Sequence, residues 1–243
     1  MLGLIPGSCV AEEEASFQPE KAVGDKPSAE QLYGLGQRAF EAGDIELALE
    51  HAEALIRQAP EDLNGYYLRG TILGQGREDY AAAAADLAEV NRLAPAFADA
   101  WGNRGWYLIL LGHFEEARVA TERAQALNPE SMSATINLGH AYLLLGDRES
   151  AHAWYRKAIP LIPDEAALDA GPLADFDLFI EHGWVPEAAR AERAWVAQAW
   201  RREWQEVGAL NARVLERYRA GDYQGAIPVA EEGLRRAVVP HAD

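Results

Sequence analysis

The chain has 243 residues, and its 22 Lys plus Arg against 39 Asp plus Glu give a formal net charge of -17. So acidic a chain repels DNA, RNA and anionic lipid headgroups at long range, which excludes sequence-independent binding to nucleic acid or to such membranes and favours basic or neutral partners. Apolar residues make up 49% of the chain, an ordinary share for a folded protein, which excludes disorder along its whole length.

Residues 1–28 predict a flexible acidic leader, because the run from Ala11 to Ser28 is mostly polar and contains Pro19 and Pro27. The single cysteine, Cys9, ends the run MLGLIPGSC, whose small-small-Cys ending resembles the box before a bacterial lipidated cysteine. The charged start and the longer apolar run of such a signal are missing. We therefore expect a cytoplasmic protein, with an envelope lipoprotein anchored at Cys9 as the alternative if the true start lies upstream. No window approaches the roughly 18 apolar residues of a membrane-spanning helix, so no membrane span is expected.

Residues 29–163 carry an internal repeat of about 34 residues. Four prolines, each at the end of a stretch of helical composition, are spaced by 35, 34 and 34 residues: Pro60, Pro95, Pro129 and Pro163. An alanine stands 12 residues before each proline: Ala48, Ala83, Ala117 and Ala151. A glycine stands 24 residues before three of them and 25 before the other: Gly36, Gly105, Gly139 and Gly70. Small residues at this regular spacing predict close helix crossings. The recurrence of the same residue types in successive units indicates a repeat architecture.

Two units carry a fuller pattern. The third has Trp101, Arg104, Gly105, Leu108, Gly112, Phe114, Ala117, Ala124 and Pro129, and the fourth has Leu138, Gly139, Tyr142, Gly146, Ala151, Tyr155, Ala158 and Pro163. This pattern resembles tetratricopeptide repeats. The resemblance implies an all-α fold, a right-handed superhelical solenoid of antiparallel helix pairs. The units are residues 29–63, 64–97, 98–131 and 132–163, with turns between paired helices at Gly43, Gly76, Gly112 and Gly146.

The register weakens in residues 164–243. Two segments, GWVPEA at 183–188 and GDYQGA at 221–226, repeat the spacing of the turn inside a unit. We therefore expect two degenerate tetratricopeptide-like repeats and a C-terminal cap. Only Gly208 interrupts the helical composition between Pro186 and Gly221, so one long helix or a kinked one is possible there.

Catalytic patterns are missing from the sequence. The six histidines are scattered without an HExxH pairing, and no phosphate-binding loop, dinucleotide fingerprint or GxSxG elbow occurs. We therefore expect no catalytic residue, no metal site and no cofactor.

Binding is the function that the resemblance implies, because the first helix of each unit lines the inner surface of such a solenoid. The inward offsets include Asp99 and Ser133 among other residues. Seven residues at these offsets are predicted to bind a partner: Tyr67, Asn103, Trp106, Ile109, Asn137, His140 and Leu143. The side-chain amides of Asn103 and Asn137 share one offset and carry both donors and an acceptor, so they suit a peptide backbone. The aromatic rings of Trp106 and His140 share another offset and suit an apolar side chain. The alternative is that these residues are ordinary packing.

Repeats of this family that grip the C-terminal carboxylate of heat-shock chaperones use lysines at inward positions. Here the corresponding offsets hold Gly102, Ile136, Trp106 and His140, and no lysine falls in the groove. A free carboxylate would enter an uncharged or acidic trough, so a chaperone-tail adaptor is not expected.

Residues 188–204 interleave three tryptophans with four arginines: Trp195, Trp200, Trp204, Arg190, Arg193, Arg201 and Arg202. Aromatics among arginines can indicate single-stranded nucleic acid, but neighbouring glutamates offset the charge, so no nucleic-acid partner is expected. Packing between the degenerate repeats is the favoured interpretation. A partner surface, including a homodimer through this tryptophan face, is the alternative.

Together these features predict a non-catalytic scaffold that binds a protein or peptide segment in the concave groove of the solenoid. Two alternatives stay open: a lipid-anchored envelope assembly factor, and a regulatory subunit of an enzyme encoded nearby.

Overall fold

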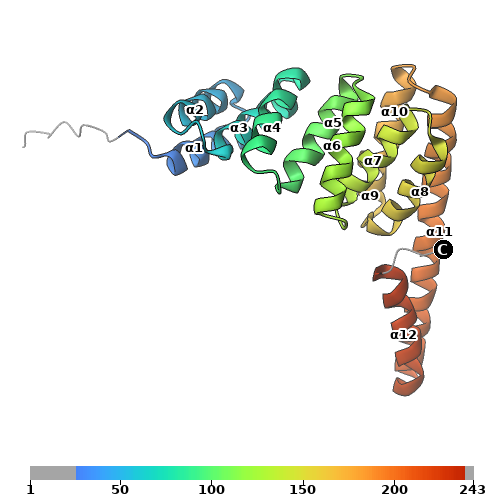
Figure 1. The fold of residues 1–243 in the computed structure, drawn as a ribbon. Helices are drawn as coiled ribbons and strands as arrows, with labels where there is room; N and C mark the ends of the chain where they lie inside the picture. Colours follow the sequence, from blue (N-terminus) through green and yellow to red (C-terminus); the bar gives the residue numbers. More distant parts are fainter. Residues whose placement is uncertain (1–25, 239–243) are drawn as a thin grey trace, which may run out of the picture.

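The computed structural model describes residues 26–238, with side chains described up to residue 233. Cys9 and residues 1–25 of the leader lie outside the described residues. Within the described range every regular element is helical (Figure 1). The first eight helices are α1 (Ala29–Glu41), α2 (Ile45–Gln58), α3 (Leu63–Thr71), α4 (Tyr80–Leu93), α5 (Ala98–Leu110), α6 (Phe114–Leu127), α7 (Met132–Leu144) and α8 (Arg148–Ala158). Among these residues no helix combines the length and the apolar character needed to cross a membrane.

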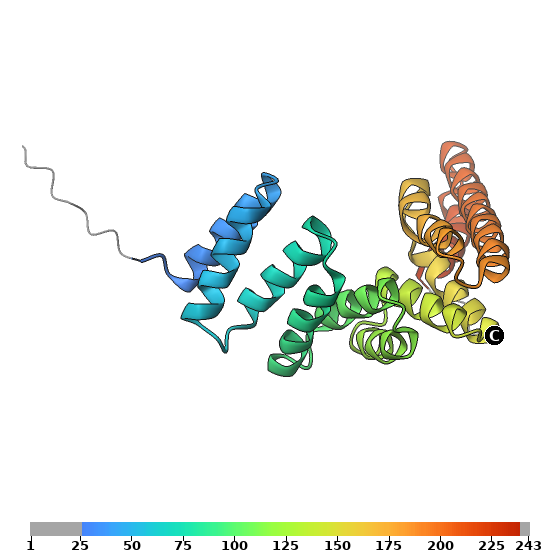
Figure 2. The same ribbon diagram turned by 90° about the horizontal axis from the view of Figure 1, so that it is seen from above.

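These eight helices form four antiparallel pairs that stack in chain order. The two helices of each pair pack on each other, and the second helix packs on the first helix of the next pair, as in α5 with α6 and α6 with α7. Seen from above, the pairs follow a curved row (Figure 2). The all-α solenoid of helix pairs predicted from the repeat is therefore confirmed.

A Gly-Asp step makes the turn inside two of the four pairs. Gly43 and Gly146 have φ of 79° and 85°, values that a side chain disfavours. The next residue, Asp44 or Asp147, then caps the following helix, because its carboxylate accepts from a backbone N–H three residues on, at 3.1 and 3.0 Å. Part of the acidic excess of the chain therefore serves to start helices.

The small residues that recur in each repeat lie where helices cross. The four alanines that stand 12 residues before the prolines have no exposed surface: Ala48, Ala83, Ala117 and Ala151. On the facing helix, a Cβ at Gly139 would lie 2.5 Å from Tyr155 Cε1, and one at Gly105 would overlap Thr121 Cγ2. These glycines are required because the facing helix leaves no room for a methyl group.

Two glycines of α5 provide a matched test of this crossing. We expect Gly105→Ala to lower the free energy of unfolding by about 1–3 kcal/mol, the usual cost of overpacking. Gly102→Ala, three residues earlier, places its Cβ an ordinary 3.7 Å from Ala124, so better helix propensity should make it neutral or stabilising by up to about 1 kcal/mol. Urea unfolding followed by circular dichroism measures both, and equal effects of the two substitutions would contradict the argument.

The second pair departs from the predicted turn. Gly76 does not form a tight left-handed turn; it ends a π-helical turn, η1 (Ile72–Gly76), and the left-handed residue is Glu78, with φ of 55°. The second repeat is one residue longer than the others, and the irregular turn formed by η1 and Glu78 accommodates that residue. Gly74 in η1 lies directly under the Tyr107 ring, so this irregular turn makes room for an aromatic side chain of the next unit.

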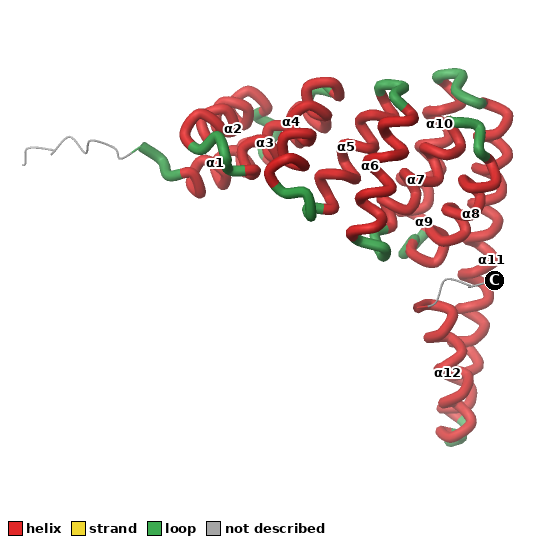
Figure 3. The backbone as a smooth tube through the Cα atoms, in the orientation of Figure 1, coloured by secondary structure: helices red, strands yellow, loops and turns green. Residues whose placement is uncertain are grey.

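The chain after α8 keeps the stack but changes its units. A 3₁₀ turn, η2 (Ile159–Leu161), leads to a bent segment formed by α9 (Glu165–Leu168), η3 (Asp169–Leu173) and α10 (Ala174–Glu181). One continuous helix of 34 residues, α11 (Pro186–Arg219), follows, and α12 (Tyr223–Val238) folds back on it (Figure 3). The segment between Pro186 and Gly221 is therefore one long helix, which packs on α10 and on α12.

Candidate functional site

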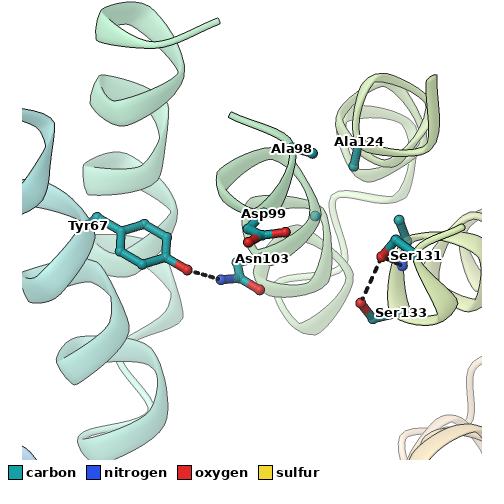
Figure 4. Close-up of a pocket in the computed structure, with 9 residues that line it drawn as sticks. Tyr67, Ala98, Asp99, Asn103, Ala124, Ser131 and Ser133 are labelled. Carbon is teal, nitrogen blue, oxygen red and sulfur yellow. Dashed lines mark hydrogen bonds between the residues drawn. The ribbon is translucent and has the colours of Figure 1, made fainter. Parts of the chain in front are cut away.

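A pocket of about 270 Å³ opens between the first helices of three successive units (Figure 4). Its walls come from α3, α5, the end of α6 and the start of α7. The lining residues are Tyr67, Ala98, Asp99, Gly102, Asn103, Ala124, Ser131, Ser133 and Ala134. The structure therefore brings two predicted binding residues, Tyr67 and Asn103, into one site.

Tyr67 and Asn103 meet across the boundary between the second and third units. The amide Nδ2 of Asn103 donates to Tyr67 Oη at 3.4 Å, and the Tyr67 ring packs on Phe97 with centroids 5.0 Å apart. Burial raises the pKa of the Tyr67 hydroxyl, and the negative charge of Asp99 raises it further. Tyr67 is therefore a neutral hydroxyl at physiological pH, available to donate and to accept a hydrogen bond.

The remaining polar groups of the pocket are chiefly acceptors. Asp99 is exposed and supplies a carboxylate. Ser131 Oγ accepts from the backbone N–H of Ala134 at 3.2 Å, and the hydroxyls of Ser131 and Ser133 lie 3.3 Å apart. None of the lining residues is a lysine or an arginine. The site therefore suits a cationic or N–H-bearing group and disfavours a carboxylate.

Sequence reasoning placed Asp99 and Ser133 at inward offsets without selecting them, and it missed Ser131. Ser131 reaches the pocket because it caps α7. A serine directly before an apolar helical run is a recognisable capping signal. That signal alone does not say that the residue faces a neighbouring unit.

Two further predicted residues, Asn137 and Trp106, are partly exposed but do not line this pocket. Asn137 lies one unit beyond Asn103. Trp106 packs against two clusters of buried apolar side chains and lies 6.5 Å from the His140 ring, measured between centroids. Both keep some surface for a partner.

The other three predicted residues, Ile109, His140 and Leu143, have no exposed surface. The expectation that they line an open groove is therefore wrong. Ile109 and Leu143 belong to the buried apolar cluster of the stack. His140 is covered by the bent segment at residues 165–181, because α10 supplies Asp175, Phe176 and Phe179, all of which contact its ring.

His140 is the centre of a buried polar network. Its Nδ1 lies 2.9 Å from Tyr155 Oη, and its Nε2 lies 3.1 Å from Asp175 Oδ2. Burial raises the pKa of Tyr155 well above its ordinary value, so its hydroxyl stays protonated. The network ties α7 and α8 to α10, and its role is to hold the fourth unit to the segment that follows.

The tryptophans of residues 188–204 do not form one exposed face. Trp200 is buried and its Nε1 donates to the carbonyl oxygen of Ile162 at 3.2 Å. Trp195 packs on His152, with ring centroids 3.8 Å apart. Only Trp204 is strongly exposed, at 44%. Core packing is thus confirmed for Trp200, and a homodimer face built from all three tryptophans is excluded by its burial.

The charged residues of the same helix also have structural partners. The Arg193 guanidinium binds the Asp177 carboxylate with two hydrogen bonds of 2.7 and 2.9 Å. Glu192 is buried and accepts from Arg148, and it lies 3.1 Å from His152 Nδ1. These pairs fasten α11 to the body of the stack. In the part of the chain that the structure describes, no group of three or more His, Cys, Asp or Glu side chains is placed to hold a metal ion.

Comparison with protein families gives three matches, all to tetratricopeptide repeat models. They cover residues 33–77, 98–131 and 134–165. The three matched stretches coincide with α1 to α3, with α5 and α6, and with α7 and α8. The stretch from 166 onward, where the repeat pattern is degenerate, lies outside these matches.

A curated relative, the Hsp70-Hsp90 organizing protein of Triticum aestivum, is 36% identical over 93 residues. The match covers 38% of this chain and 16% of that protein, so the chain spans a small part of its relative. Among solved structures, a crystal structure of MamA is similar with a TM-score of 0.53 and 24% identity, covering 56% of this chain and 80% of MamA. A second structure, MamA MSR-1, gives a TM-score of 0.50 and 25% identity, covering 55% and 76% of the two chains. The likeness to MamA shows a shared fold.

Proposed function

The chain belongs to the tetratricopeptide repeat proteins, and from that premise we propose that it is a non-catalytic scaffold that holds a segment of a partner protein against the inner face of its helix stack. The observation that carries this proposal is the pocket around Tyr67 and Asn103. Three successive first helices contribute to it, so a segment lying across them would contact several units at once.

The contacts follow from the exposed predicted residues. The amides of Asn103 and Asn137 hydrogen-bond the backbone of the segment, because an amide side chain matches both the N–H and the C=O of a peptide. Trp106 supplies apolar contact beside them. The buried side chains of Ile109, His140 and Leu143 are left out of the contact. Affinity near micromolar, about -8 kcal/mol, is expected when a flexible segment loses conformational freedom on docking.

The charge of the pocket selects the partner. Asp99 is its one charged group, and the hydroxyls around it accept hydrogen bonds, so a basic or neutral segment is favoured. The name of the wheat relative concerns Hsp70 and Hsp90. The lysines with which family members grip chaperone carboxylates are replaced here by Gly102, Ile136, Trp106 and His140, which argues against the same ligand for this chain.

A capture experiment tests the scaffold function. We expect the wild-type chain to retain a partner from the native lysate, and the double variant Asn103→Ala/Asn137→Ala to bind that partner at least about tenfold more weakly, a loss of about 1.4 kcal/mol. Asn128→Ala, an exposed asparagine at the end of α6, is the matched control. Mass spectrometry identifies the partner, and titration with the purified partner gives Kd. Equal binding by the double variant, folded by circular dichroism, would rule out the asparagine contacts.

A further inference from the structure

The distal part of α11 and the paired part of α12 form a helical arm that leaves the stack (Figure 1). We define this arm as residues 207–230. Its two helices pack on each other, while the proximal half of α11 packs on α8 and α10. The arm therefore consists mainly of two helices packed on each other, and it meets the stack where α11 and α12 contact η2.

The core of this arm is thin. Between its helices only Leu210, Ala226 and Val229 are buried, at 9%, 8% and 8% exposure. Four large apolar side chains remain about half exposed or more: Leu215 at 52%, Tyr218 at 61%, Tyr223 at 58% and Ile227 at 49%. Two helices cannot bury apolar side chains on more than their mutual face, and additional helices are the usual solution.

The exposed apolar residues form one patch. Leu215 and Tyr218 are three residues apart and share a face of α11. The rings of Tyr218 and Tyr223 meet edge to face with centroids 5.1 Å apart, which continues the patch across the turn. Ile227 lies one helical turn beyond Tyr223 on the same face of α12. A contiguous apolar patch on an exposed arm marks an interaction surface.

Charge indicates which partner fits. Within residues 207–230 the charged residues are Arg213, Glu216, Arg217, Arg219 and Asp222, a net charge of about +1 on simple counting. The remainder of the chain carries the entire acidic excess that gives the overall -17. Two copies can therefore bring these nearly neutral arms together with little like-charge repulsion at the contact. An antiparallel arrangement also places the two acidic stacks at opposite ends, where their repulsion is weakest.

We propose that the arm is a surface on which a second copy of this chain docks, with the two arms antiparallel in a four-helix bundle that buries Leu215, Tyr218, Tyr223 and Ile227. Such a two-fold contact is self-complementary, since the same patch serves on both copies. It lies apart from the pocket at Tyr67 and Asn103 and does not depend on what that pocket binds.

Sedimentation equilibrium of the full chain tests this proposal, over about 1 to about 200 μM, the range in which micromolar association is seen. We expect the wild type to approach twice its chain mass of 26.6 kDa as concentration rises. Leu215→Glu/Ile227→Glu should raise the dimer dissociation constant at least about tenfold, since it places charges in the apolar contact. Both positions are exposed, so the fold should survive, which circular dichroism verifies.

Val119→Glu is the matched control, because Val119 is 52% exposed on α6, away from the arm. It should dimerise as the wild type does, and so should Asn103→Ala/Asn137→Ala, which separates this proposal from the groove. A wild type that stays monomeric throughout the range would overturn the proposal, and the apolar patch would then be a docking surface for a different protein. A dimer that the arm variant leaves intact would also overturn it.

Discussion

Replacing His140 by alanine is expected to lower the free energy of unfolding by about 3–5 kcal/mol. The imidazole has no exposed surface and lies among the rings of Phe176 and Phe179, so its removal leaves a cavity in the core. The same change removes the partner of the Tyr155 hydroxyl, which is itself buried. His140→Ala therefore carries two penalties, one for the cavity and one for the unpaired hydroxyl of Tyr155.

Two variants separate the terms of this prediction. Asn137→Ala, one turn earlier on α7 and partly exposed, should change stability by less than about 1 kcal/mol. Tyr155→Phe removes one hydrogen-bonding group and keeps the ring, so about 1–3 kcal/mol is expected. Urea unfolding of the three variants and of the His140→Ala/Tyr155→Phe double variant gives the coupling energy of the pair. If His140→Ala kept wild-type stability but bound the partner weakly, the burial argument would be contradicted and His140 would be a partner-binding residue.

The regular part of this fold could be predicted from the sequence because its cause is local. Close crossings need glycine and alanine at fixed offsets, as at Gly139, where a Cβ would reach Tyr155. Helix ends need prolines and capping residues, and the turns need glycine, as at Gly43 and Gly146. Each of these requirements recurs once per unit, so the same residue types reappear at a fixed spacing and the helix pairs can be predicted from the sequence.

The candidate site could be predicted in part only. Tyr67 and Asn103 meet in one pocket, because the second and third units stack regularly and leave those side chains partly exposed. His140 shares its offset with Trp106, yet one is buried and the other is not. The difference comes from Asp175 and its neighbours, which lie 35 residues later in a segment without the repeat pattern. Burial by a degenerate unit leaves no signal at the residue that it covers.

The end of the chain shows the same limit. The composition of residues 186–219 allowed one helix, and Gly208 does not break it, because a single glycine costs a helix interior only about 1 kcal/mol relative to alanine. Which of the tryptophans on this helix face the core depends on how the helix docks. Docking is set by η2 and α10, far from the tryptophans in sequence.

Trp200→Ala should lower the free energy of unfolding by about 3–5 kcal/mol, the usual cost of truncating a buried large aromatic residue. The Trp200 indole fills the space between α11 and the 3₁₀ turn, and its Nε1 donates to the buried carbonyl of Ile162. Truncation therefore removes apolar contact and leaves that carbonyl without its partner.

Trp204→Ala is the control for this prediction. It changes the same residue type one helical turn later, where the side chain is 44% exposed, so a loss below about 1 kcal/mol is expected. Thermal and urea unfolding measure both variants, and sedimentation of each reports association. If Trp200→Ala kept its stability and lost association, the indole would act at an interface between copies and the docking of α11 would differ from that described. If stability falls and association of the folded fraction persists, Trp200 fixes the base from which the arm projects, and the contact between copies lies beyond it.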